Sequence, residues 1–265
     1  MNIFIVEMKA HRKSLIIWAF GILFMVGAGM GKYVALSGTG QSMNELFAQM
    51  PKSMQAIIGI GTLDISKASG YYGLLFSYLL LMATIHAAML GADIISKEER
   101  DKTVEFLLTK PISRNKIITS KLLAGLMNIV IFNIITLVSS MVIVGKYSKG
   151  EDVSSDIAIL MVGMFILQLI FLFIGTAIAA ISKRPKTATS ISTAILLITY
   201  ILSIAIDVNS KLENLKYLTP FKYYGAGSLM AGDGFQLSFV ILSMIILIGT
   251  LSVTYTFYKK RDLTI

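Results

Sequence analysis

The chain alternates between long apolar runs and shorter polar connections. Each apolar run is long enough to cross about 30 Å of hydrocarbon as an α-helix. The pattern predicts six membrane-spanning helices, at about residues 15–36, 71–95, 117–145, 157–181, 188–206 and 235–258. We therefore expect an all-α membrane protein, a six-helix bundle in which residues 1–265 form one transmembrane domain. Because six is an even number, both termini are expected on the same side.

A strongly charged connection, residues 96–116, lies between the second and third predicted spans and reads SKEERDKTVEFLLTKPISRNK. Within it, Val104, Leu107 and Leu108 recur at i, i+3 and i+4, which puts three apolar side chains on one helical face. The spacing predicts a short amphipathic helix at the membrane surface. A plain solvated hairpin tip between two spans is the alternative reading of the same pattern.

The ends of this short helix have their own signals. Asp101 is placed to cap its start. Pro111 is expected to end it, because proline lacks an N–H and restricts the residue before it. Ser113 can then cap the helix that continues into the third span.

The connections on the other side are modest in size. Between the first two spans, apolar residues recur at helical spacing, namely Leu46, Phe47, Met50, Met54, Ile57 and Ile58. Pro51 is expected to divide this segment into two short helices. We interpret this segment as amphipathic helix that rests on the outer leaflet or caps the bundle, with direct substrate contact as the alternative. Residues 1–13 are expected to form a short leader before the first span.

Composition agrees with a chain embedded in lipid. Of its residues 55% are hydrophobic and 15% charged, whereas soluble domains carry about 25% charged residues. If the termini are cytoplasmic, the whole formal excess of +9 falls on the cytoplasmic side, as the positive-inside rule requires. The basic balance is therefore a topology signal, and it removes the need for a nucleic-acid partner.

Candidate catalytic chemistry is sparse. The chain has no cysteine and only two histidines, and it contains no G-x-x-x-x-G-K-[ST], G-x-S-x-G or H-E-x-x-H motif. No catalytic, cofactor-binding or metal-binding residue is assigned, and any energy from ATP must come from another polypeptide. His86 and Asp93 lie seven residues apart on one face of the second span. A proton or metal role is conceivable for them, but interhelical hydrogen bonding and interfacial placement are favoured.

Other polar and small residues within the spans indicate helix packing. Asn128, Asn133 and Gln168 are expected to join helices to one another. The pairs Gly27-x-x-x-Gly31, Ala87-x-x-x-Gly91 and Ser190-x-x-x-Ala194 would allow close helix approach.

Residues 99–114, ERDKTVEFLLTKPISR, resemble the segment between the second and third spans of type-2 ABC exporter permeases, also called type V ABC transporters. That family shows an acidic run, Thr-x-Glu-x-Leu-Leu, and then Pro-Ile/Val-Ser-Arg, often with Gly before the Thr where this chain has Lys102. The resemblance implies a cytoplasmic coupling helix that docks into a groove on the ATPase subunit. Its docking residues would be Thr103, Glu105, Phe106, Leu107, Leu108, Pro111 and Arg114.

Two further segments resemble the same family in the same order, MNELFAQMPKSMQAIIGIG after the first span and YLTPFKYY (217–224) before the last. The resemblance implies that the second of these dips back into the membrane as a broken helix. It also implies that the first and fifth spans of two permeases meet. The candidate residues for that dimer interface are Gly27, Gly31, Ser190 and Ala194.

The resemblance implies a permease subunit of an ATP-binding cassette exporter in a cell membrane, with a bacterial plasma membrane expected. Two ATPase copies, which bind ATP and Mg, and a second permease, identical or related, would complete it. The substrate would be amphipathic: a drug, a peptide antibiotic or a lipid. An ion-coupled secondary transporter or channel is the alternative, but paired mid-membrane acids and matching inverted halves do not stand out. A membrane enzyme would need a nucleophile and a base, which are not found.

Overall fold

The computed structural model describes residues 2–37, 43–61, 63–103, 112–148, 150–182, 184–232 and 234–260. Across these ranges every regular element is helical. Six helices are long and apolar enough to span a membrane, which confirms the six predicted spans. They are α1 (Ile3–Ser37), α4 (Ala68–Arg100), α6 (Arg114–Tyr147), α7 (Ser154–Ile181), α8 (Pro185–Val208) and α10 (Leu237–Lys260).

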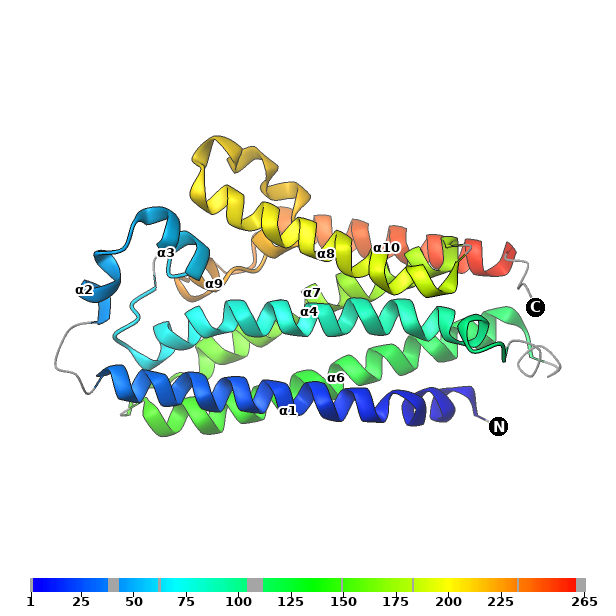
Figure 1. Ribbon diagram of the computed structural model, residues 1–265, viewed down its shortest axis with the longest axis horizontal. Helices are drawn as coiled ribbons and strands as arrows, with labels where there is room; N and C mark the ends of the chain where they lie inside the picture. The colour runs from blue at the N-terminus through cyan, green and yellow to red at the C-terminus, as the bar shows by residue number, and fades with distance from the viewer. Residues whose placement is uncertain are drawn as a thin grey trace.

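The long helices lie lengthwise beside one another (Figure 1). The start of α1 and the end of α10 lie at one end of the bundle, together with the end of α4, the start of α6, the end of α7 and the start of α8. We call this the terminal end. The opposite end, here the loop end, carries the short helices α2 (Met43–Ala48), α3 (Lys52–Ile58) and α9 (Ala226–Met230). The prediction that both termini share one side fits this arrangement.

Helices α4 and α7 form the centre of the bundle, and glycines bring their backbones together. A Cβ atom added at Gly91 would stand 2.1 Å from the carbonyl oxygen of Leu172. On the facing helix, a Cβ at Gly175 would stand 2.5 Å from the carbonyl oxygen of Ala88. Side chains at either glycine would separate the helices, so the predicted close approach at Gly91 is confirmed.

Helix α1 begins earlier than the sequence pattern predicted. The expected leader is not separate, because one continuous helix runs from Ile3 to Ser37. Its buried positions recur every three or four residues and form a stripe that faces the bundle, namely Ile3, Glu7, His11, Leu15, Ala19, Ile22, Val26, Met30 and Tyr33. The leader thus adds its own buried face, including two polar side chains, to the core.

The loop between α1 and α4 contains two short helices, as predicted, with Pro51 directly before α3 as its N-cap residue. Helix α3 ends at Gly59, whose φ of +86° is a left-handed conformation that favours glycine. A Cβ at Gly59 would stand 3.2 Å from Ser77 Oγ of α4. The C-terminal end of α3 therefore lies beside the outer part of α4, while the helix itself packs mainly against α8.

The loop before α10 turns back into the bundle. It contains the 3₁₀ helices η1 (Ser210–Leu218) and η2 (Pro220–Lys222), followed by α9. The Phe221 ring packs against Phe171 of α7 and Tyr200 of α8, with centroid distances of 5.3 and 5.2 Å. Buried Tyr224 shares a hydrogen bond of 2.7 Å with Ser243 of α10. The irregular backbone around Phe221 and Tyr224 is thus covered by protein, which is the condition that a segment dipping into a membrane would have to meet.

Helix α4 ends in a tight cap. Lys102 takes a left-handed φ of +56°, and the Thr103 N–H donates to the Glu98 carbonyl at 2.8 Å. This six-to-one bond is the signature of a Schellman motif. Asp101 is the C-cap residue of α4 and pairs with Arg100 at 3.0 Å. The short helix that Asp101 was predicted to cap lies outside the described residues.

Candidate functional site

At the terminal end, a buried lysine joins three helices. Lys121 of α6 has no exposed surface. Its Nζ donates to Glu98 Oε1 at 2.5 Å and to the Ile94 carbonyl oxygen at 2.6 Å, both on α4. Glu7 Oε1 of α1 lies 3.2 Å from the same nitrogen. Three oxygens thus surround the ammonium group, two of them as hydrogen-bond acceptors and the third as an ion-pair partner.

Glu7 continues this network toward the surface. It is 2% exposed, and its second oxygen, Oε2, accepts a hydrogen bond from Lys97 Nζ of α4 at 2.5 Å. The same oxygen lies 3.5 Å from His11 Nε2. We call Glu7, Lys97, Glu98 and Lys121 the terminal ion network. Its charges balance, so each buried ion has an oppositely charged partner.

Four more polar side chains border the network. His11 Nδ1 lies 3.9 Å from Asp93 Oδ2, and Asp93 is paired with Arg100 on its own helix. Arg100 also binds Asp101, at the point where the chain leaves α4. Polar side chains therefore lie next to one another from α1 to the end of α4, where Arg100 and Asp101 form an ion pair.

The predicted docking residues fall partly within the described chain. Thr103 caps the end of α4. Arg114 is the first residue of α6, and its Nη1 donates a hydrogen bond to the Lys259 carbonyl oxygen of α10 at 2.8 Å. Ser113 caps α6 as predicted, accepting from the Lys116 N–H at 3.4 Å. The other docking residues lie outside the described residues and remain predictions: Glu105, Phe106, Leu107, Leu108 and Pro111.

The buried histidine of α4 lies between aromatic rings. The His86 ring stacks on Phe132 of α6 at a centroid distance of 5.0 Å and lies 5.6 Å from the Trp18 ring of α1. Asp93 instead faces His11 and Arg100. Within the described ranges, no group of three or more His, Cys, Asp or Glu side chains could hold a metal ion. The His86 ring thus packs between helices, but its Nδ1 has no hydrogen-bond partner among the described residues, so the interhelical hydrogen bond that the sequence analysis favoured is not observed.

The predicted polar contacts between helices are present. Asn133 Nδ2 of α6 donates to Gln168 Oε1 of α7, and Gln168 Nε2 reaches the Ala83 carbonyl oxygen of α4 at 3.4 Å. Asn128 of α6 contacts Met8 Sδ of α1 at 3.3 Å. These side chains join helices to one another, so the interpretation as interhelical contacts is confirmed.

The dimer-interface candidates face away from their own bundle. Cβ atoms added at Gly27 or Gly31 would meet nothing within 4 Å. Ser190 and Ala194 of α8 are exposed. These surfaces are open to lipid or to another subunit, and their pairing in a dimer remains a prediction.

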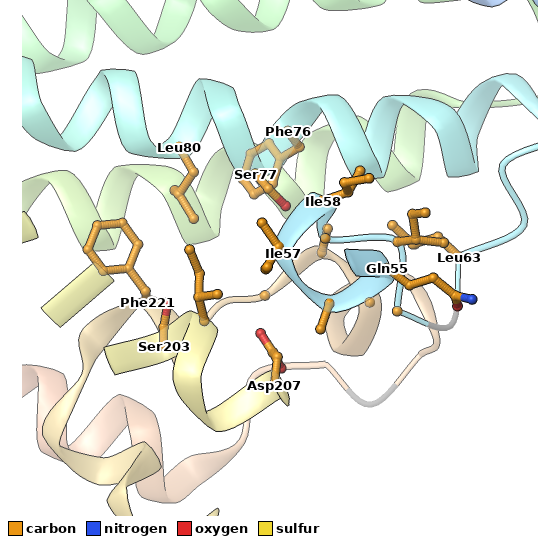
Figure 2. Close-up of a pocket in the computed structure, with 18 of the residues that line it drawn as sticks. Gln55, Ile57, Ile58, Leu63, Phe76, Ser77, Leu80, Ser203, Asp207 and Phe221 are labelled. Carbon is orange, nitrogen blue, oxygen red and sulfur yellow. The ribbon is translucent and has the colours of Figure 1, made fainter. Parts of the chain in front are cut away.

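A cavity of about 530 Å³ opens at the loop end, between α3, the outer part of α4, the end of α8 and the loop before α10. Figure 2 shows Ile57 of α3, Leu80 of α4 and Asp207 of α8 among its lining residues. Its volume lies in the range of pockets that hold small molecules, roughly 300–1,000 Å³.

Sequence reasoning missed the terminal ion network, although a signal was available. Lys121 lies inside the predicted third span, where a lone ammonium group is costly and implies a buried partner. Glu7 and His11 are four residues apart, a spacing that places both on one helical face. Extending helix α1 to the start of the chain would have brought them to the same interface as Lys121.

Comparison with known proteins gives one family match. A family model described as "ABC-2 family transporter protein" matches residues 1–263 of the chain. A search of curated proteins gave no match.

Proposed function

Because the chain belongs to the ABC-2 family of transporter proteins, we propose that it is the permease subunit of an exporter powered by a separate ATPase. Family membership and six apolar helices make it a multi-pass membrane protein. The proposed complex contains two permeases, identical or related, and two ATPase subunits that bind ATP and Mg. The membrane is proposed to be a bacterial plasma membrane, with both permease termini in the cytoplasm.

In this proposal the ATPase docks at the terminal end, on the segment between Thr103 and Arg114. Leu107 and Leu108 fill a groove on the ATPase, and Glu105 pairs with one of its basic residues. ATP binding biases the permease only if the docked segment contacts the ATPase differently in the permease's two states. The segment's two flanks connect to α4 and to α6, so a shift of the segment acts on both helices.

The terminal ion network is the observation that carries this proposal. Glu98 lies three residues before the α4 C-cap and binds Lys121 of α6, while Lys97 binds Glu7 of α1. On the other flank, Arg114 binds the last turn of α10. A displacement of the docked segment would therefore move the cytoplasmic ends of four helices together.

The alternative, an ion-coupled transporter, has less support. It calls for acidic groups near the middle of the membrane. Among the described spanning helices, the paired carboxylates Glu7, Asp93 and Glu98 lie near the terminal end, and Asp207 of α8 lies at the loop end; each has a basic partner. An exporter driven from outside the bundle needs no such mid-membrane group.

Co-purification with the ATPase encoded beside this gene tests the proposal. We expect the wild-type permease to retain the ATPase through size-exclusion chromatography in detergent. The double substitution Leu107→Asp and Leu108→Asp should abolish retention, because two carboxylates would have to enter an apolar groove.

A matched control carries two new carboxylates at the loop end, Met54→Asp and Leu218→Asp, where both native side chains are exposed. This control should retain the ATPase like the wild type. Retention of the ATPase by the Leu107 and Leu108 double variant would show that the docking assignment is wrong.

A further inference from the structure

The cavity at the loop end has an apolar floor. Leu80 of α4, Tyr200 of α8 and Phe221 of the loop before α10 line its inner part. The Tyr200 and Phe221 rings meet edge to face, with centroids 5.2 Å apart. Tyr200 precedes Asp207 by two helical turns, so the cavity extends about 10 Å along α8 at 1.5 Å per residue.

The mouth of the cavity is charged. Asp207, near the end of α8, forms an ion pair with Lys222 of η2, and both residues line the cavity. Lys52, the first residue of α3, lines it as well. The Asp207 and Lys222 charges cancel, so Lys52 leaves the mouth with one excess positive charge. A ligand that places an anionic group there and an apolar body inside would match both regions.

Helix α3 forms one wall of the cavity and is held close to α4. The Tyr78 hydroxyl of α4 donates to the Ile58 carbonyl oxygen at 3.4 Å, and Gly59 allows the near contact with Ser77 described above. Ile57, on the same turn, lines the cavity and remains 56% exposed. Figure 2 shows Ile57 at the centre of the lining, with Leu80 and Asp207 around it.

We propose that this cavity binds a single-chain anionic amphiphile, with the acyl chain against Leu80, Tyr200 and Phe221 and the acidic head beside Lys52. A volume of about 530 Å³ lies in the range of pockets that hold one small molecule, and it suits a single acyl chain. The inference rests on the proposed function only in naming this ligand as the class of substrate that the exporter releases at its outer face. The binding itself requires no ATPase.

The test uses the full-length permease alone, purified in lipid nanodiscs, with a dansyl-labelled undecanoic acid as the fluorescent probe. Ile57→Asp puts a carboxylate into the apolar part of the cavity. Met54→Asp is the matched control, because Met54 lies on the same short helix, is 48% exposed and does not line the cavity. We expect Ile57→Asp to lose saturable probe binding and Met54→Asp to bind like the wild type. Equal binding by both variants would overturn the proposal.

Competition identifies the head group. Palmitate presents a carboxylate and lysophosphatidate a phosphate, whereas monopalmitoylglycerol is neutral. We expect the anionic competitors to displace the probe at about fivefold lower concentration than the neutral one, and Lys52→Gln to remove that preference. Lys146→Gln is the control, because Lys146 lies on α6 and outside the cavity. This variant should keep the preference for anionic competitors. The stronger anionic competitor identifies the preferred head.

Displacement by the neutral competitor at the same concentration as the anionic ones would contradict the assigned ligand class. The result is independent of the docking test above. A permease that binds the probe but not the ATPase would contradict only the proposed function, and the reverse result only the cavity assignment.

Discussion

Lys121 shows how a charged side chain is accommodated inside this bundle. Its ammonium group has no exposed surface, yet it reaches two carboxylates and one carbonyl oxygen from two neighbouring helices. Removing one partner from such a group is costly, because the opposite charges stay buried without compensation. The ion network therefore holds the terminal ends of α1, α4 and α6 in one arrangement.

We predict that Lys121→Ala destabilises the protein by about 3–5 kcal/mol, since Glu98 loses its basic partner and Glu7 loses one of two. The thermal midpoint in detergent should fall by roughly 10 °C. Lys116→Ala, an exposed lysine on the same helix, is the control and should leave the midpoint nearly unchanged. A midpoint for Lys121→Ala equal to that of the control would show that the network contributes little.

Individual contacts followed from the sequence where one residue type has a strong local preference. Ser113 was predicted as an N-cap because serine follows a proline that ends the preceding helix. Asn128, Asn133 and Gln168 were predicted to join helices because burying an unpaired amide in lipid is costly. Glu7 was not predicted, because its partners Lys97 and Lys121 are distant in sequence and no local pattern joins them. Lys102 shows a different case: the resembling family often has Gly there, and the left-handed φ explains that preference.

At the scale of helices, the hydrophobic runs predicted all six spans, because the bilayer sets a minimum apolar length. The predicted start of the first span, at about residue 15, is not the start of helix α1, which begins at Ile3. Hydropathy marks where the lipid-embedded part of a helix begins, and the helix itself can extend beyond it. Residues 3–13 stay helical by packing their buried stripe on α4 and α6. The crossing partner of α4 was also not predictable, because a small-residue pair shows that a close approach is possible but not to which helix.

The close crossing of α4 and α7 depends on Gly91. We predict that Gly91→Ala lowers the thermal midpoint by roughly 5 °C or more, because the new methyl group meets the Leu172 backbone, which cannot move aside alone. Gly145→Ala is the matched control, since a Cβ there meets nothing within 4 Å. If both variants melt together with the wild type, the two helices are not packed as closely as described.

At the scale of the whole molecule, the distribution of charge orients the bundle. The terminal end carries the excess of basic residues, so the positive-inside rule predicts that this end faces the cytoplasm. Because the chain has no cysteine, single cysteines report on each end without background labelling.

We predict that a membrane-impermeant maleimide labels Lys211→Cys, in the exposed η1 segment of the loop end, on intact cells. Asn115→Cys, an exposed position at the terminal end, should react only after the membrane is permeabilised. The opposite labelling pattern would invert the topology and remove the proposed ATPase site from the cytoplasm.

We propose that this permease moves its substrate only when a separate ATPase hydrolyses ATP at its terminal end. The test uses proteoliposomes that contain the permease and the ATPase encoded beside its gene, loaded with a dansyl-labelled fatty acid. The measurement is the ATP-dependent movement of this probe across the bilayer. We predict movement with ATP and Mg, and none with a non-hydrolysable analogue, without the ATPase or with the Leu107→Asp and Leu108→Asp permease. Movement by the permease alone, driven by an ion gradient, would contradict the account.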